Sequence, residues 1–361
     1  MKVISASADL DLSWVQSVFD RRYPGQNITV RAFDVTSSPS MTGNTALLKL
    51  SFEDQLPARV PRSLFLKFCR PNDLFIKDSE YLYYTRDYEG LEDSPVPVCY
   101  DAQYSPDGAY HVLLEDLSQT HYSNKEIRPT LEHALSVATE LARLHAFRWA
   151  TTARAAGLEG ETTLQLSAFV EHVSPALPAI LNNIGDEVPA QRLEIIRKVF
   201  ALYPVLMKER AAVLSGQTLI HGDANPSNVL SPHDPAGKTY LIDRQPFTWS
   251  VRHWLGVLDL AYMAVPFWDV GDRRSLERPM LKHYHDSLTT FGVTDYSWEQ
   301  CESDYQLCIP YGMYVAVGWG LNKQQLSAMK WLWEKQLRRS MEAFLDWGCD
   351  ELLRPGRVPD A

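Results

Sequence analysis

The chain has 361 residues, of which 45% are hydrophobic and 22% are charged, and its formal net charge is −10. This length allows two domains or lobes with large buried cores. The acidic balance disfavours a nucleic-acid-binding protein, because phosphate contacts need clustered Lys and Arg. The five cysteines are scattered and form no Cys-x-x-Cys pair, which predicts reduced thiols rather than disulfides or a zinc site.

The N-terminus carries Asp9 and Asp11 where a signal peptide needs an apolar run. No stretch approaches the roughly 20 apolar residues of a membrane-spanning helix. The sequence therefore predicts a cytoplasmic protein without a membrane partner.

The first third of the chain favours strands. Every second residue from 46 to 52 is apolar, which predicts a strand with one apolar face. Residues 63–68 predict a second strand that pairs with the first as a hairpin. Residues 76–88 predict a helix. Two further strands, 98–104 and 110–114, flank a Ser-Pro-Asp-Gly turn.

The pattern changes after residue 117. Residues 130–149 carry apolar side chains at spacings of three and four, which is typical of an amphipathic helix. Residues 191–215 predict another helix, and 257–353 are mostly helical. Short strands are expected at 228–230 and 239–242. These patterns predict an α+β protein with a β-rich N-terminal lobe over residues 1–116 and a mainly helical C-terminal lobe over residues 117–361.

The strongest motif is His-Gly-Asp-Ala-Asn-Pro-Ser-Asn at 221–228, in a loop that leads into a strand. Asp223 precedes Asn228 by five residues, and Asp243 ends a second strand fifteen residues later. Phosphoryl transfer needs a carboxylate that orients the attacking hydroxyl and oxygen ligands that hold magnesium. The alternative is that these residues only form turns and strand ends, where Asp and Asn are common.

This motif resembles the catalytic loop and metal-binding strand of the aminoglycoside phosphotransferase and choline-kinase-like superfamily. Residues 95–102 and 112–117 are most similar to its ecdysteroid-kinase-like branch, and the resemblance extends from about residue 43 to residue 261. It implies a bilobal, protein-kinase-like fold. It also implies an ATP-dependent phosphotransferase that moves the γ-phosphate of Mg-ATP onto a hydroxyl of a small molecule.

The resemblance assigns roles by position in the motif. Asp223 would be the catalytic base, and Asn228 and Asp243 would bind Mg²⁺. Lys67 would reach the α- and β-phosphates of ATP, and Glu80 would pair with Lys67 to fix its position.

Other positions follow from the same resemblance. Gly43 would lie in the hairpin that covers the nucleotide, although this hairpin has one glycine rather than a glycine-rich loop. Glu115, Asp116 and Leu117 would form the hinge whose backbone meets adenine. Asp259 would brace the catalytic loop.

Several of these positions have alternatives. Asp78, Asp87 or Glu89 could pair with Lys67 in place of Glu80. Arg244, which follows Asp243, could contact phosphate or substrate, or cap the strand.

The substrate is expected to be small. Only fifteen residues separate Asp243 from Asp259, and the Ala-Pro-Glu tripeptide that closes a protein-kinase activation segment is absent. The helical lobe is rich in aromatic residues and also carries acids, which suits a cationic or ring-containing alcohol. Most aromatics of a helical domain, however, form its core.

Two other classes of function compete with a kinase. The first is a non-catalytic nucleotide-binding regulator of the same fold. The second is a hydrolase that uses Asp223 and His221, but it lacks a Gly-x-Ser-x-Gly elbow and a cluster of metal-binding histidines.

Overall fold

The computed structural model describes residues 2–39, 43–53, 57, 59–69, 77–149, 161–184, 188–245 and 247–354. The chain forms two compact units. Unit 1 contains Met1–Tyr122 and Ser231–Thr248, and unit 2 contains Ser123–Leu230 and Trp249–Ala361. The sequence patterns divide the chain once, after residue 116, whereas the structure also assigns Ser231–Thr248 to the strand-rich unit.

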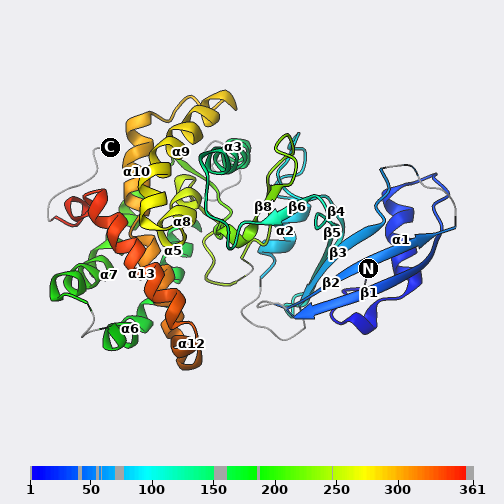
Figure 1. The fold of residues 1–361 in the computed structure, drawn as a ribbon, viewed down its shortest axis with the longest axis horizontal. Helices are drawn as coiled ribbons and strands as arrows, with labels where there is room; N and C mark the ends of the chain where they lie inside the picture. The colour runs from blue at the N-terminus through cyan, green and yellow to red at the C-terminus, as the bar shows by residue number, and fades with distance from the viewer. Residues whose placement is uncertain are drawn as a thin grey trace. The chain divides into compact units, whose positions relative to one another are not determined.

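Unit 1 is built on a five-stranded antiparallel sheet with the order β1-β2-β3-β5-β4 (Figure 1). Its strands are β1 (Val30–Pro39), β2 (Asn44–Phe52), β3 (Ser63–Cys69), β4 (Cys99–Tyr104) and β5 (Tyr110–Glu115). Its helices are α1 (Leu12–Arg22) and α2 (Ser79–Thr85). The short strand β9 (Tyr240–Leu241) also belongs to unit 1, while β6 (His121–Ser123) and β8 (Val229–Pro232) contain the first two points at which the chain passes between units.

The two faces of the sheet pack against different partners. On one face, Leu48, Leu64 and Leu66 are fully buried with Val18 and Phe19 of α1. On the other face, Tyr110, Val112 and Leu114 pack with tyrosines of α2. The predicted hairpin of β2 and β3 is confirmed, with Ala46 paired with Leu66.

Helix α1 and strand β1 are additions to the predicted elements. The signal for α1 is local, because Asp11 accepts a hydrogen bond from the backbone N–H of Trp14 and so caps the helix. Trp14, Val15, Val18 and Phe19 then give it a buried face. Of the predicted helix 76–88, residue 76 lies outside the described residues, and within residues 77–88 helix α2 covers Ser79–Thr85.

Unit 2 is mainly helical, as predicted (Figure 1). Its helices are α3 (Leu131–Phe147), α5 (Glu161–Val173), α6 (Leu177–Ile184), α7 (Ala190–Ala211), α8 (Val257–Phe267), α9 (Val270–Thr290), α10 (Trp298–Cys308), α11 (Tyr311–Gly318), α12 (Lys323–Ala328) and α13 (Lys330–Asp346). Strands β7 (Gln217–Leu219) and β10 (His253–Leu255) pair antiparallel. Thr130 caps α3 by accepting from the N–H of His133, although a Glu or Gln at 133 would give a full capping box.

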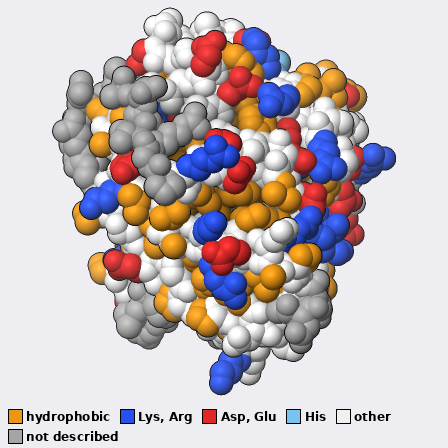
Figure 2. All heavy atoms as spheres, turned by 90° about the vertical axis from the view of Figure 1, so that its left-hand side faces the viewer, with side chains coloured by type: hydrophobic (Ala, Val, Ile, Leu, Met, Phe, Trp, Pro, Cys, Tyr) orange, Lys and Arg blue, Asp and Glu red, His pale blue; other side chains and the backbone are white. Residues whose placement is uncertain are grey.

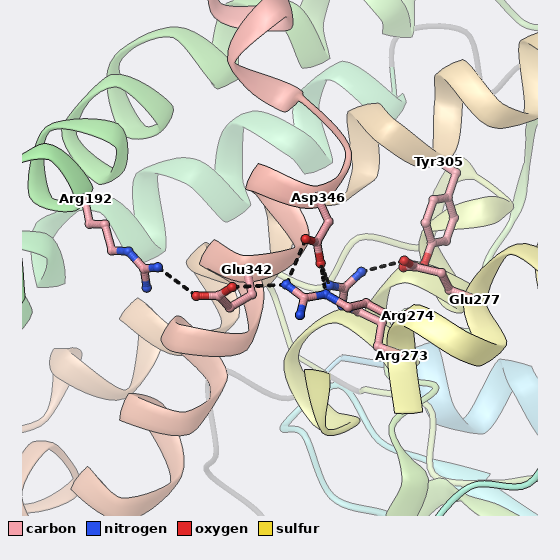
Figure 3. A network of polar contacts seen from close by, with 7 residues as sticks. All are labelled: Arg192, Arg273, Arg274, Glu277, Tyr305, Glu342 and Asp346. Carbon is pink, nitrogen blue, oxygen red and sulfur yellow. Dashed lines mark hydrogen bonds and ion pairs between the residues drawn. The ribbon is translucent and has the colours of Figure 1, made fainter. Parts of the chain in front are cut away.

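A network of charged side chains and one tyrosine joins four of these helices. Arg273 of α9 is fully buried and bonds to Glu277 and Asp346, while Arg274 beside it bonds to Asp346 at 2.7 Å. The connected network spans α7, α9, α10 and α13 and consists of Arg192, Arg273, Arg274, Glu277, Tyr305, Glu342 and Asp346 (Figure 3). Each buried charge in it has an ion-pair partner, which offsets part of the cost of burial.

Figure 2 shows one face of the molecule, with hydrophobic side chains in a band across its middle and charged groups around them. Exposed apolar residues of unit 2 include Leu202 and Val205 of α7 and Trp331 of α13. None of the helices in the described ranges has the length and apolar run needed to span a bilayer.

Candidate functional site

Lys67 lies on β3 and is almost fully buried. Its Nζ is 2.9 Å from Oε2 and 3.0 Å from Oε1 of Glu80, at the start of α2. The hydroxyl of Tyr110 also donates to Glu80. Of the acids proposed as partners of Lys67, Asp87 instead bonds to two arginines. The helical phase of α2 therefore directs Glu80 towards Lys67.

The electrostatics of this pair are set by burial and by a second acid. Burial would lower the pKa of Lys67, but the carboxylates of Glu80 and Asp243 outweigh it and hold that pKa above its ordinary value. Burial raises the pKa of Glu80 to about 7, and the ammonium group of Lys67 acts in the opposite direction. Lys67 is therefore a permanently charged cation in a buried position.

Asp243 completes the surroundings of Lys67 within unit 1. Its carboxylate forms an ion pair with Lys67 and remains 42% exposed. Its backbone is left-handed, with φ of 62°, and its N–H donates to the hydroxyl of Tyr84 at 3.0 Å. Tyr83 holds the preceding strand by donating to the carbonyl of Leu241 at 2.9 Å. Two neighbouring tyrosines of α2 thus support a backbone conformation that is unfavourable for most residues.

Arg244 has a structural partner. Its guanidinium is 1% exposed and donates to Oδ2 of Asp87 at 2.7 Å, and it lies over the ring of Tyr83. The side chain therefore anchors the segment after Asp243 to the region of α2. The ion pair with Asp87 was not among the roles considered from the sequence, which were a contact with phosphate or substrate and a strand cap.

Gly43 has a packing reason to be glycine. A Cβ at this position would lie 2.5 Å from the carbonyl oxygen of Phe68 and 2.8 Å from the sulfur of Cys69. The start of β2 therefore approaches β3 more closely than any other residue permits.

Several polar groups of the proposed hinge, residues 115–117, form hydrogen bonds within unit 1. The N–H of Glu115 donates to Val98, and the carbonyl of Leu117 accepts from His121 at 2.9 Å. Asp116 accepts from the hydroxyl of Ser63 at 2.6 Å. An adenine ring would have to use other backbone groups of residues 115–117.

In unit 2, Asp223 is held by two amide side chains from its own loop. Asn225 donates to Oδ1 at 2.9 Å, and Asn228 donates to Oδ2 at 3.2 Å and to the backbone carbonyl at 2.9 Å. Asn225 also caps the short 3-10 turn Pro226–Asn228. The spacing of the motif therefore forms a compact loop in which the carboxylate is oriented by its neighbours.

Aromatic residues lie beside Asp223. Burial raises the pKa of Tyr262 well above its ordinary value, and the negative charge of Asp223 acts in the same direction. Tyr311 is affected in the same way. Its ring stacks on Phe169, with centroids 4.5 Å apart. Tyr262 was not singled out from the sequence, where its position in an apolar helix favours the core.

Asp259 braces this loop. It is fully buried, and its carboxylate accepts from the backbone N–H of His221 at 2.6 Å and of Gly222 at 2.8 Å. Gly222 has φ of 78°, and a Cβ there would lie 2.8 Å from the carbonyl oxygen of Val251. The loop therefore needs glycine at this position, and Asp259 satisfies two amides of its tight turn.

The proposed magnesium ligands offer suitable chemistry in each unit. Asp243 supplies an accessible carboxylate, and Asn228 must use its Oδ1, because its Nδ2 donates to Asp223. Both are hard oxygen donors of the kind that Mg²⁺ prefers. Within the described ranges, no group of three or more His, Cys, Asp and Glu side chains is arranged as a metal site.

The model of the ecdysteroid kinase-like family matches residues 77–292, which is more than half of the chain. The chain belongs to the ecdysteroid kinase-like family. No curated protein matches it at a significant level.

Three solved structures share the fold of this ecdysteroid kinase-like protein. Choline kinase from Cryptosporidium parvum has a TM-score of 0.58 at 12% identity, covering 96% of this chain and 98% of that chain. A protein from Ralstonia eutropha assigned as an aminoglycoside phosphotransferase gives 0.56 at 12%, covering 95% and 98%. Plasmodium vivax ethanolamine kinase gives 0.55 at 11%, covering 93% and 88%. The predicted α+β, protein-kinase-like fold is confirmed.

Proposed function

We propose that this ecdysteroid kinase-like protein transfers the γ-phosphate of Mg-ATP to a hydroxyl group of a small molecule. The observation that carries the proposal is the position of Lys67, buried in unit 1 between Glu80 and Asp243. Stability alone does not readily explain a buried ion pair, because apolar side chains of similar volume often stabilise a fold as well or better. The arrangement is better explained by a cation kept charged and oriented for phosphate.

The proposed roles of the residues are those that the family resemblance implies, and their chemistry is compatible with them. Lys67 binds the α- and β-phosphates, and Glu80 positions Lys67. Asp223 binds the acceptor hydroxyl and takes up its proton. Asn228 and Asp243 hold Mg²⁺, which, when bound, neutralises charge on the phosphates. Gly43 and residues 115–117 contact the nucleotide.

The acceptor is proposed to be a small alcohol with a ring or a positive charge. Tyr262 and Tyr311 lie near Asp223, and Phe169 stacks on Tyr311, although all three rings are largely buried. Aromatic faces bind rings by stacking and bind cations through the ring quadrupole. The three structural neighbours are named for choline, aminoglycosides and ethanolamine.

The test is ADP release from Mg-ATP across a panel of hydroxylated small molecules, with phosphorylated product detected by mass spectrometry. Asp223→Asn should lower kcat by about 10² to 10⁴-fold, because a general base contributes this much. It should leave nucleotide affinity within about threefold, since it keeps the size of the side chain. Asp234→Asn, in an exposed turn, is the matched control and should behave as wild type.

Other results would select other functions. Nucleotide binding without transfer to any acceptor would favour the regulator. Release of free phosphate without a phosphorylated product would favour the hydrolase. Full turnover in Asp223→Asn would remove Asp223 as the base.

A further inference from the structure

A buried tyrosine contacts the histidine that lies behind the Asp223 loop. Tyr284 of α9 and His145 of α3 are both fully buried. The hydroxyl of Tyr284 is 2.8 Å from Nδ1 of His145, and Nε2 of His145 is 3.0 Å from Oδ2 of Asp259. One continuous set of hydrogen bonds therefore runs from α9 through α3 to the aspartate that binds the loop.

The charge state of Asp259 determines the direction of these bonds. Burial would raise the pKa of Asp259, but the hydrogen bond from His145, electrostatic attraction to the His145 and His221 rings and the hydrogen bond from the Gly222 amide hold it below its ordinary value. Asp259 is therefore an ionised carboxylate, which can only accept. Its partners at Nε2 of His145 and at the backbone nitrogens of His221 and Gly222 must all donate.

This requirement places a proton on Nε2 of His145. A neutral imidazole with its proton on Nε2 has a lone pair on Nδ1, which needs a donor. Burial raises the pKa of Tyr284 well above its ordinary value, so its hydroxyl keeps its proton and donates to Nδ1. The Tyr284 hydroxyl is thus matched to the tautomer that Asp259 requires.

Gly256 lies directly against this hydrogen bond. A Cβ at position 256 would be 2.4 Å from the Tyr284 hydroxyl and 2.9 Å from Nδ1 of His145. The backbone of Gly256 is right-handed, with φ of −57°, so an alanine would meet no backbone restriction there. The absence of a side chain is therefore explained by the space that the hydrogen bond needs.

We propose that Tyr284 is a positioning residue for the Asp223 loop, because its hydroxyl holds His145 in the tautomer that lets Asp259 bind the His221 and Gly222 amides. Loss of the hydroxyl leaves a buried acceptor without its donor. The imidazole then reorients, and the two loop amides are held less firmly. Only the last link, from the loop to turnover, rests on the proposed function.

The experiment compares Tyr284→Phe with Tyr296→Phe in the full chain. Tyr296→Phe is a matched control, because it also removes a buried tyrosine hydroxyl, which donates to Asp304 at 2.9 Å. Nitrogen NMR of ¹⁵N-histidine-labelled protein should show His145 protonated on Nε2 in the wild type and in Tyr296→Phe, and should show an altered Nδ1 signal in Tyr284→Phe. Amide exchange at His221 and Gly222 should be about tenfold faster in Tyr284→Phe alone.

Turnover gives the third measurement. In Tyr284→Phe, kcat should fall about tenfold while the KM values for Mg-ATP and acceptor stay within about twofold, because misplacement of the loop affects the reacting geometry. Gly256→Ala should reproduce these changes by displacing the hydroxyl from the other side. The double variant should be no worse than either single one, since both act on the same bond.

Two results would overturn the inference. A wild-type His145 with a proton on Nδ1, in the other neutral tautomer or in a doubly protonated ring, would contradict the proposed direction of the hydrogen bonds. Equal amide exchange at His221 and Gly222 in the two tyrosine variants would show that Tyr284 does not hold the loop. If no acceptor supports turnover in the wild type, the proposed function fails, and the NMR and exchange measurements still decide the role of Tyr284.

Discussion

Lys67 and Asp243 are 176 positions apart in the chain and form an ion pair inside unit 1. Glu80 contacts the same ammonium group from α2. The three side chains come from β3, from α2 and from the segment that follows β9. A single cation thus joins three parts of the unit, and its removal should affect both stability and the proposed reaction.

Replacement of Lys67 by Met should lower kcat/KM by about 10²-fold or more, because a preorganised cation at the phosphates is lost. It should also lower the free energy of unfolding by about 3 kcal/mol, because Glu80 remains buried without its cation. Urea denaturation and steady-state kinetics measure the two effects. The double variant Lys67→Met/Glu80→Gln should recover most of the stability but none of the activity. Recovery of activity would contradict the assignment of Lys67.

Two substitutions of Asp243 separate the effect of its left-handed backbone from the effect of its charge. Asn tolerates the left-handed region, so Asp243→Asn should retain the local backbone. Asp243→Ala should be less stable than Asp243→Asn by about 1 kcal/mol. Both should lose activity and bind Mn²⁺, measured by electron paramagnetic resonance, more weakly than wild type does. Equal metal binding in wild type and Asp243→Asn would remove Asp243 as a ligand.

Arg244 should prove to be structural. Arg244→Met leaves Asp87 buried without its main cation and should lower the free energy of unfolding by about 3 kcal/mol. Under conditions where the variant is folded, its KM for Mg-ATP should match that of wild type. Asp87→Asn in the same chain should restore part of the stability. A variant of normal stability with a tenfold higher KM would place Arg244 at the phosphates instead.

The network of Figure 3 predicts a pH dependence of stability. Burial would raise the pKa of Asp346, but hydrogen bonds from Arg274 and Arg273 hold it below its ordinary value. A carboxyl whose pKa is lower in the folded chain stabilises the fold above its unfolded pKa of about 4. This contribution is lost as the pH falls through the folded pKa.

Asp346→Asn should therefore lower the free energy of unfolding by about 1 kcal/mol at pH 7, because solvent screens this exposed carboxylate, and the difference from wild type should shrink below about pH 4. Urea denaturation at a series of pH values measures it. Asp350→Asn serves as a control, because Asp350 is exposed and lies 3.8 Å from Arg354. A difference between wild type and Asp346→Asn that is constant from pH 7 to pH 3 would contradict the assignment.

The predictable parts of the fold were those with a local periodic signal. The alternation in β2 and β3 and the apolar stripe of α3 gave elements that the structure confirms within a few residues. Helix α1 has the same kind of signal, with a cap at Asp11. It was not predicted, because Asp9 and Asp11 were considered only as evidence against a signal peptide. Assignment of Ser231–Thr248 to unit 1 could not be predicted, because it depends on contacts between residues far apart in the chain.

The candidate site also has parts with a local sequence signal and parts that depend on contacts between distant residues. The spacing of Asp223, Asn225 and Asn228 forms a loop held by its own side chains, so a sequence motif captures it. The partner of Lys67 depends on the phase of a seven-residue helix, which several nearby acids leave open. The surroundings of Arg244 and the contact of Tyr284 with His145 depend on packing between elements, which has no signature in the sequence.

The late return of residues 231–248 to unit 1 also matters during protein synthesis. At about 5 to 20 residues per second, a ribosome needs roughly 9 to 35 s to extend the chain by the 176 positions from Lys67 to Asp243. During that interval β9 and the second carboxylate beside Lys67 do not yet exist. A fragment that stops at Tyr122 would have the same deficiency permanently. An expression fragment of unit 1 should therefore carry residues 231–248 on a linker, so that β9 and the Asp243 carboxylate beside Lys67 are present.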